Sequence, residues 1–300
     1  MSTDQTSPLV RAHGLTKRFG DFTAVDAVDF DVQAGEAFGF LGPNGAGKTS
    51  TMRMIGCISP VTEGSLEVLG MDPLSQGSAI RGRLGVVPQQ DTLDLELTVM
   101  ENLLIYGRYF DLSYSEARRR AEELLDFVQL RERADAEVEP LSGGMKRRLT
   151  IARGLINEPD MMLLDEPTTG LDPQARHLVW ERLYRLKKQG VTLILTTHYM
   201  DEAEQLCDRL VVMDQARIVA EGSPRSLIED HIAQIGLREA QSRGGGGKGL
   251  GNRCPAEDMV LHRFFRSFFR SFLGVVADSV FGFSRRISTI CWRSDQRLAV

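Results

Sequence analysis

The stretch that decides the fold is Gly42-Pro43-Asn44-Gly45-Ala46-Gly47-Lys48-Thr49. It satisfies the phosphate-binding pattern G-x-x-x-x-G-K-[ST]. An apolar run of strand type precedes it at residues 36–41, and residues 51–55 after it are typical of a helix. Glycines let the backbone turn so that N–H groups point at phosphate oxygens, and the N-terminus of the following helix adds a positive dipole end. The sequence therefore predicts a nucleotide-binding loop in an α/β fold.

Each part of this loop has a chemical role. Lys48 reaches the β- and γ-phosphates of a bound nucleotide, and the hydroxyl of Thr49 is placed to ligate Mg²⁺. We take Gly42 through Ser50 as the ATP-binding loop. The alternative is a glycine-rich turn with an incidental lysine. Because glycine makes up about 7% of residues, a chance match in a chain of this length is on the order of 1%, which favours the nucleotide site.

A second glycine motif follows at Leu141-Ser142-Gly143-Gly144-Met145. Ser142 is in the position of an N-cap for a helix through residues 146–152. A serine hydroxyl and glycine N–H groups at a helix start also form an anion site. We expect Ser142, Gly143 and Gly144 both to cap this helix and to bind phosphate.

Candidate catalytic residues follow two apolar runs that are typical of buried parallel strands. Asp165 and Glu166 directly follow the apolar run at residues 161–164, and His198 directly follows the run at residues 191–197. Ligands bind at the carboxyl ends of strands in doubly wound folds. Asp165 there is predicted to hold Mg²⁺, and Glu166 to polarise the attacking water. His198 is predicted to donate a hydrogen bond to the γ-phosphate.

Taken in this order, the motifs resemble those of the nucleotide-binding subunits of ATP-binding cassette (ABC) transporters, over roughly residues 8–235. The segments 85–94, 101–104 and 107–110 resemble the ATPases of type-2 exporters, and most closely the branch that exports nodulation factors (lipo-chitooligosaccharides) and drugs. Met145 stands where many family members have glutamine. It lies outside the phosphate-binding triplet, so we expect little consequence.

The resemblance implies further roles. Phe19 would stack on adenine, Gln89 would sense Mg²⁺ and couple to the membrane partner, and Asp172 would cross the interface between two cassettes. The implied cofactors are ATP and Mg²⁺. The implied assembly is a homodimer of cassettes on a separate integral-membrane permease, peripheral to the cytoplasmic face of the inner (plasma) membrane.

Composition and patterning set the domain organisation. One phosphate loop and one signature, the glycine motif at residues 141–145, indicate a single cassette over residues 1–236. We expect it to have an antiparallel β subdomain and an inserted helical subdomain, at about 95–157, that carries the signature. Ser113 and Glu116 predict a capping box at a helix start there. The net charge of −5 gives no reason to expect a nucleic-acid partner. The four widely spaced cysteines favour free thiols. No stretch of the sequence reaches 18 uncharged apolar residues, so we expect no membrane-spanning segment.

The last 64 or so residues differ in character. Residues 1–236 carry 25 Lys and Arg against 36 Asp and Glu, whereas residues 237–300 carry 11 against 5, so the net charge changes from −11 to +6. Residues 244–247 are a glycine linker, and a phenylalanine and arginine stripe at 264–273 has helical spacing. We expect a disordered or partly helical tail, either lying on an anionic membrane surface or without function.

Three functions remain open from the sequence. The first is an ATPase that drives export through a separate permease. The second is a non-transport ATPase of the same fold that acts on ribosomes or DNA, although this chain lacks the second cassette or the long coiled coils of such proteins. The third is an inactive product with an aberrant C-terminus.

Overall fold

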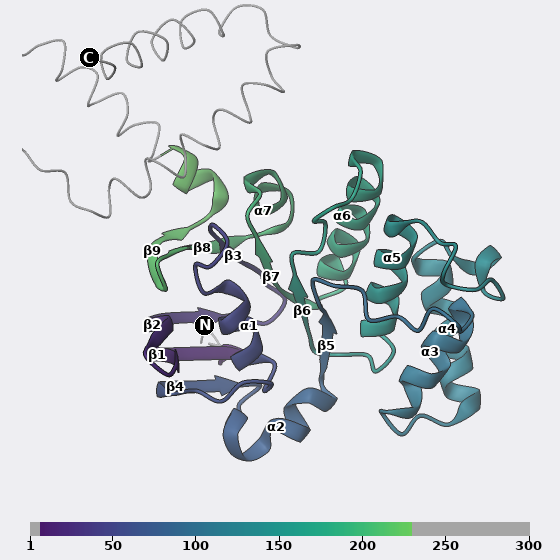
Figure 1. Ribbon diagram of the computed structural model, residues 1–300, viewed down its shortest axis with the longest axis horizontal. Helices are drawn as coiled ribbons and strands as arrows, with labels where there is room; N and C mark the ends of the chain where they lie inside the picture. Colours follow the sequence, from purple (N-terminus) through teal and green to yellow (C-terminus); the bar gives the residue numbers. More distant parts are fainter. Residues whose placement is uncertain (1–6, 230–300) are drawn as a thin grey trace, which may run out of the picture. The chain divides into compact units, whose positions relative to one another are not determined.

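The computed structural model describes residues 7–229, and the predicted tail at 237–300 lies outside this range. Two sheets are present in the described part of the chain (Figure 1). The smaller is antiparallel, in the order β2 (Phe22–Val32), β1 (Val10–Phe19), β4 (Glu63–Val68). The larger has the order β5 (Leu84–Val87), β6 (Met161–Asp165), β7 (Thr192–Thr197), β3 (Ala37–Leu41), β8 (Arg209–Asp214), β9 (Arg217–Gly222).

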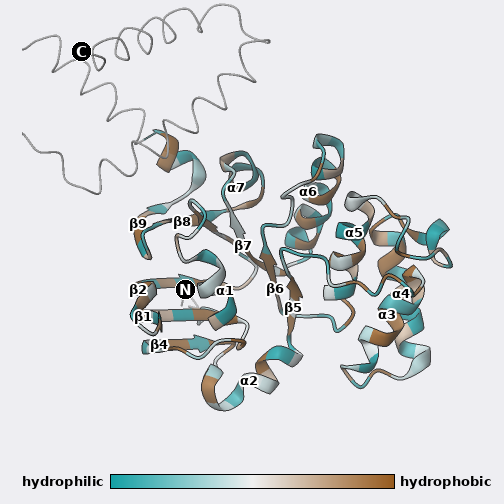
Figure 2. Cartoon of the chain, viewed as in Figure 1, coloured by the Kyte–Doolittle hydropathy of each residue, from teal (hydrophilic) through white to brown (hydrophobic). Residues whose placement is uncertain are grey.

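The larger sheet is parallel from β5 to β8, and β9 is antiparallel to β8. Strands β3 and β7 are buried at every residue, as expected for strands covered on both faces. Figure 2 shows hydrophobic residues, in brown, along β5 and β6. An aromatic cluster joins the two sheets: Phe40 on β3 lies 5.1 Å from Phe30 on β2 and 5.3 Å from Phe38, between ring centroids. The mixed α/β fold with an antiparallel β subdomain is confirmed.

The helices are α1 (Lys48–Ile55), α2 (Pro73–Gly82), α3 (Val99–Arg108), α4 (Tyr114–Phe127), α5 (Gly143–Gly154), α6 (Pro173–Lys188) and α7 (Met200–Leu206), with a 3₁₀ turn η1 (Arg131–Arg133). Helices α3, α4 and α5 lie together at the end of the larger sheet away from β1, β2 and β4 (Figure 1). They share a hydrophobic core of their own, which includes Leu103, Leu125 and Leu149. This helical unit carries Ser142 at the N-cap of α5.

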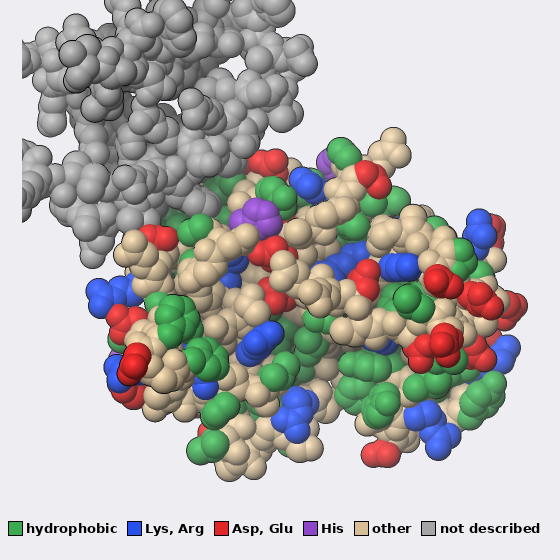
Figure 3. Space-filling model, in the orientation of Figure 1, with side chains coloured by type: hydrophobic (Ala, Val, Ile, Leu, Met, Phe, Trp, Pro, Cys, Tyr) green, Lys and Arg blue, Asp and Glu red, His purple; other side chains and the backbone are tan. Residues whose placement is uncertain are grey.

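One local expectation was half right. Ser113 caps α4 by accepting from the N–H of Glu116, but no reciprocal bond forms, because the Glu116 carboxylate pairs with Arg119 and Arg120. Acidic and basic side chains are mixed on the surface in the region of α4 (Figure 3). A complete capping box forms instead at Thr98 and Glu101, at the start of α3.

The register of the parallel strands positions the site. Leu41 at the end of β3 is paired with Thr197 of β7, and Asp165 at the end of β6 is paired with Thr196. The residues that follow these strands therefore emerge at one edge of the sheet. Gly42, Glu166 and His198 are brought together in this way although up to 156 residues separate them in the chain.

Candidate active site

The loop before α1 has the backbone that its glycines require. Gly47 has φ +105°, and a Cβ at this residue would lie 2.5 Å from the carbonyl oxygen of Ala24. Gly47 is also the N-cap of α1, and it has no side chain that could accept from the first N–H groups of the helix. The first N–H groups of a helix have no intrahelical acceptor. The start of α1 therefore offers N–H donors and the positive end of its dipole, which suit a phosphate group.

Lys48 lies under this loop. Its side chain is 5% exposed, and Nζ donates to the carbonyl oxygens of Gly42 at 2.7 Å and Pro43 at 3.0 Å. Burial lowers the pKa of Lys48, and the negative charges of Glu166 and Asp165 oppose this shift. Nζ lies 3.9 Å from Glu166 Oε1. A buried ammonium whose nearest partners are mostly carbonyls is suited to a polyanionic ligand.

Glu166 is the centre of the site. Its backbone is in the left-handed region with φ +45°, a conformation that costs energy for a residue with a side chain. The N–H of Glu166 donates to Thr196 Oγ1 at 3.0 Å. The carboxylate is buried, and its neighbours come from four segments: His198 Nδ1 at 3.3 Å and Lys48 Nζ on Oε1, and Gln89 Nε2 and Thr169 Oγ1, both at 3.1 Å, on Oε2.

Asp165 faces the hydroxyl of Thr49. Thr49 Oγ1 lies 3.3 Å from Asp165 Oδ1, and Thr196 Oγ1 donates to the same oxygen at 2.5 Å. A hydroxyl and a carboxylate are the hard oxygen donors that Mg²⁺ takes from proteins, while phosphates and water complete its shell. The pair therefore fits Mg²⁺. Gln89, the third predicted metal residue, has its amide on Glu166 instead of on this pair.

Arg147 on α5 braces the loops that carry these residues. Its side chain is buried, and burial lowers the pKa of the guanidinium, opposed by the charges of Asp91, Glu202 and Asp165. The guanidinium donates to four backbone carbonyls: Pro167 at 2.7 Å, Asp165 at 3.1 Å, Glu166 at 3.2 Å, and Pro88. One side chain thus holds the segments of Gln89 and Glu166 against the helix that Ser142 caps.

The second predicted group forms a separate cluster. Ser142 Oγ accepts from the N–H of Met145 at 3.3 Å, which confirms the predicted N-cap. Asp172 caps α6 by accepting from the N–H of Ala175 at 2.9 Å. A Cβ at Gly144 would lie 2.7 Å from the Cβ of Ala175, so the two helix starts are in contact.

These helix starts are not joined to the Lys48 loop. Within residues 7–229, no hydrogen bond or ion pair links residues 142–144 to Lys48 or Thr49. Figure 1 shows α5 on the far side of β6 from α1. Phe19, the predicted adenine-stacking residue, is 52% exposed at the end of β1, with Lys17 Nζ 4.8 Å from its ring centroid.

Sequence reasoning missed three residues that contact the site: Thr169, Thr196 and Arg147. A signal existed for Thr196, because it precedes the strand end by one residue and parallel pairing aligns it with Asp165. Thr169 lies three residues after Glu166, within reach of that carboxylate in a tight turn. Nothing local marks Arg147, whose acceptors lie on loops distant in the chain.

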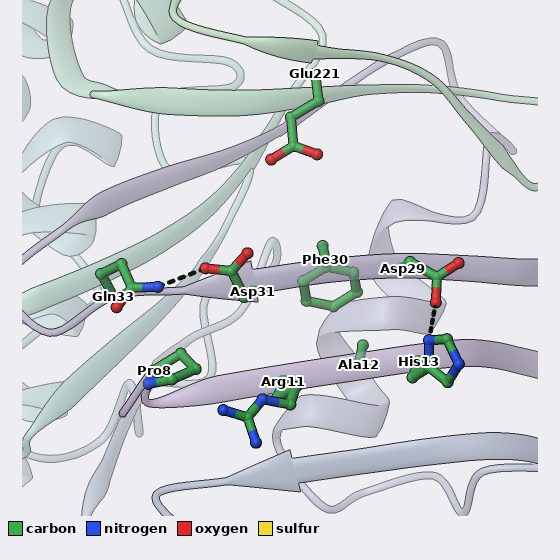
Figure 4. Close-up of a pocket in the computed structure, with 9 residues that line it drawn as sticks. All are labelled: Pro8, Arg11, Ala12, His13, Asp29, Phe30, Asp31, Gln33 and Glu221. Carbon is green, nitrogen blue, oxygen red and sulfur yellow. Dashed lines mark hydrogen bonds and ion pairs between the residues drawn. The ribbon is translucent and has the colours of Figure 1, made fainter. Parts of the chain in front are cut away.

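A pocket on the smaller sheet lies outside this site. Figure 4 shows it between β1, β2 and β9. Its acidic groups already have partners: Asp29 pairs with His13, and Asp31 and Glu221 both accept from Arg209. We assign it no ligand.

Comparisons with known proteins agree with this geometry. A family profile described as ABC transporter matches residues 25–169. A Nod factor export ATP-binding protein I from Ralstonia nicotianae is 52% identical over 227 residues, which cover 76% of this chain and 71% of the relative. The protein of the same name from Burkholderia thailandensis is 55% identical over 218 residues, covering 73% and 72%.

Solved structures give the same picture. An ATP-binding cassette, described as a dimer in a post-hydrolysis state with ADP and Pi, superposes with a TM-score of 0.66 at 28% identity, covering 72% of this chain and 98% of the other. A component of the ABC transporter complex cbiONQ from Clostridium perfringens gives a TM-score of 0.70 at 26% identity, covering 79% and 96%.

Proposed function

Because this chain belongs to the ABC transporter family, as a subunit that binds ATP with Mg²⁺ and hydrolyses it, we propose that two copies close around two ATP molecules and drive export through a separate membrane permease. The observation that carries the proposal is the position of Glu166, whose buried carboxylate is within 4 Å of Lys48, His198, Gln89 and Thr169. Such a cluster of ionisable and polar groups beside a phosphate loop is suited to phosphoryl transfer.

The separation of the two glycine motifs supports pairing of chains. Ser142 caps a helix that lies apart from α1, so this chain's signature is not placed on its own Lys48 loop. A second copy, turned to face the first, supplies a signature to that loop in our proposal. The dimeric cassette with ADP and Pi described above supports this arrangement.

The proposed reaction uses positioning and electrostatics. Glu166 accepts a proton from water as the water oxygen bonds to the γ-phosphorus, and the bond from that phosphorus to the β,γ-bridging oxygen breaks. Lys48 and the N–H groups at the start of α1 stabilise the charge on the phosphates. Thr49 and Asp165 would hold Mg²⁺, which neutralises phosphate charge when bound. Gln89 and His198 contact Glu166 from opposite oxygens and keep it oriented.

The transport assignment rests on the relatives. Relatives of more than 50% identity are named for Nod factor export, and we propose a lipo-oligosaccharide or a drug as cargo. None of the helices described for residues 7–229 is long and apolar enough to cross a membrane. We place the subunit at the cytoplasmic face of the inner membrane, bound to its permease.

We propose a cassette at residues 1–236, with its helical signature subdomain at about 95–157.

Mixing two defective chains tests the shared site. A Lys48→Ala chain and a Ser142→Arg chain, each inactive alone, form a mixed dimer with one intact site, so the mixture should regain a measurable ATPase rate. Lys48→Ala mixed with itself at the same total concentration is the control. Tight ATP-dependent dimers of the Ser142→Arg chain alone would contradict the proposal, because a bulky arginine there obstructs closure.

A further inference from the structure

A second buried carboxylate lies behind the catalytic loop. Glu202 on α7 is 1% exposed, and the proposed reaction makes no direct use of it. Its Oε1 accepts from Thr168 Oγ1 at 2.7 Å and from Trp180 Nε1 at 3.4 Å. Its Oε2 has no hydrogen-bond partner among the described residues. A carboxylate in this position is costly to bury, and hydrogen bonds offset part of that cost, so the segment that donates the shorter bond is held against it.

That segment is the loop of residues 166–172, which joins β6 to α6. It begins at Glu166 and ends at Asp172, the N-cap of α6. Thr168, in its middle, is fully buried. Arg147 donates to the carbonyl of Pro167 at 2.7 Å, so adjacent residues of the loop are held from α5 and from α7. Trp180 on α6 adds a bond from the same carboxylate to the helix that follows the loop.

Glu202 also lies on the element that follows His198. Helix α7 begins at Met200, and the N–H of Tyr199 donates to Thr197 Oγ1 at 3.0 Å. The bond from Thr168 to Glu202 therefore ties the loop of Glu166 to the segment of His198. These two segments meet in the site, where His198 Nδ1 is 3.3 Å from Glu166 Oε1.

The charges around Glu202 come from the helices packed on it. Arg176 on α6 and Arg147 on α5 interact favourably with its negative charge, while Cys207 at the end of α7 is a neutral thiol whose pKa is raised by burial. Burial raises the pKa of Glu202, and this shift is opposed by the nearby hydroxyl of Thr197, by the hydrogen bonds from Thr168 and Trp180, and by the charge of Arg176.

We propose that Glu202 is a positioning residue for ATP hydrolysis: through Thr168 it fixes the loop of Glu166 relative to His198. This inference deepens the proposed function, because it rests on Glu166 as the base. Its alternative is a carboxylate that only stabilises the packing of α6 and α7. A group that acts by position changes turnover, because a small displacement of a catalytic group costs much of the rate.

The test removes one hydroxyl. Thr168→Val keeps the shape of the side chain and deletes the bond to Glu202, and we expect kcat to fall about 10- to 100-fold while the Kd for ATP changes less than about twofold. Thr168→Ser restores the donor and should recover most of the rate. Thr192→Val is the matched control, since Thr192 is equally buried but bonds the N–H of Gly35, away from the loop. It should leave kcat unchanged.

A double-mutant cycle and an activity-independent readout complete the test. Glu202→Met, which removes the acceptor of the Thr168 hydroxyl, should lower kcat, and adding Thr168→Val to it should lower kcat little further. Amide hydrogen exchange of residues 167–171 should accelerate in Thr168→Val and not in Thr192→Val. Wild-type kcat in Thr168→Val, additive effects in the cycle, or unchanged exchange would overturn the proposal. If Glu166→Gln kept its turnover while exchange still accelerated in Thr168→Val, the choice of base would be at fault and the tie through Glu202 would stand.

Discussion

Arg147 gives the strongest test of how the helical unit is attached to the loops that carry Gln89 and Glu166. We predict that Arg147→Met destabilises the protein by about 3 kcal/mol. A hydrogen bond from a charged donor contributes about 1.5 kcal/mol or more, so four such bonds give about 6 kcal/mol. Burial disfavours the charged guanidinium, which is why its pKa is lowered. The cost of burying it is several kcal/mol and offsets about half of this sum.

The neighbouring arginine is a matched control. Arg148 is on the same helix and donates to the carbonyls of Val128 at 2.6 Å and Gln129 at 3.4 Å, from a half-buried position. Arg148→Met should cost about 1 kcal/mol, because fewer bonds are lost and water replaces them. The assay is urea unfolding of wild type and both variants, followed by circular dichroism, with the m-values compared. Equal losses for the two variants, or a loss below about 1 kcal/mol for Arg147→Met, would refute the bracing role.

Two further predictions concern the periphery. Arg209 donates to Asp31, Glu36 and Glu221, so Arg209→Met should cost about 1–2 kcal/mol of stability at pH 7, measured by thermal unfolding. Burial tends to raise the pKa of Asp31, but hydrogen bonds from Arg209 and Gln33 and the charge of Arg209 lower it overall. The difference in stability between wild type and variant should therefore narrow as the pH falls below about 3.8, and a difference that widens in acid would contradict the assignment. A chain that ends at residue 236 should keep its melting temperature and ATPase rate, since the core described above lies within residues 7–229, and a truncated chain that unfolds would show that the tail packs on the core.

Much of the fold was predictable because it follows from short-range rules. The run at residues 36–41 and the glycines after it require a strand and a tight turn, and both are observed. The convergence of Asp165, Glu166 and His198 followed from one topological fact, that parallel strands end at a common edge. The predicted roles of the individual site residues stay predictions until they are tested.

Other features depend on tertiary approach and carry no local signal. Arg147 and Glu202 are ordinary polar helix residues in the sequence, and their meaning comes from the carbonyls and the hydroxyl that other elements bring to them. The predicted capping box at Ser113 is incomplete for a local reason. Glu116 has Arg119 and Arg120 next to it on the same helix, and these charged partners compete better for its carboxylate than a backbone N–H does.

The central claim is that Glu166 is the base for ATP hydrolysis, and the most direct measurement is the steady-state ATPase rate of Glu166→Gln. This change removes the negative charge and keeps the shape of the side chain, so the Mg²⁺ pair Thr49 and Asp165 is left in place. Loss of a general base lowers the rate by about 10²–10⁴-fold. ATP binding should persist, and the variant should accumulate as an ATP-bound dimer on a sizing column. Glu132→Gln, an exposed carboxylate on η1, is the control and should hydrolyse ATP at the wild-type rate. Turnover near wild type in Glu166→Gln would contradict the account and assign the base to another group.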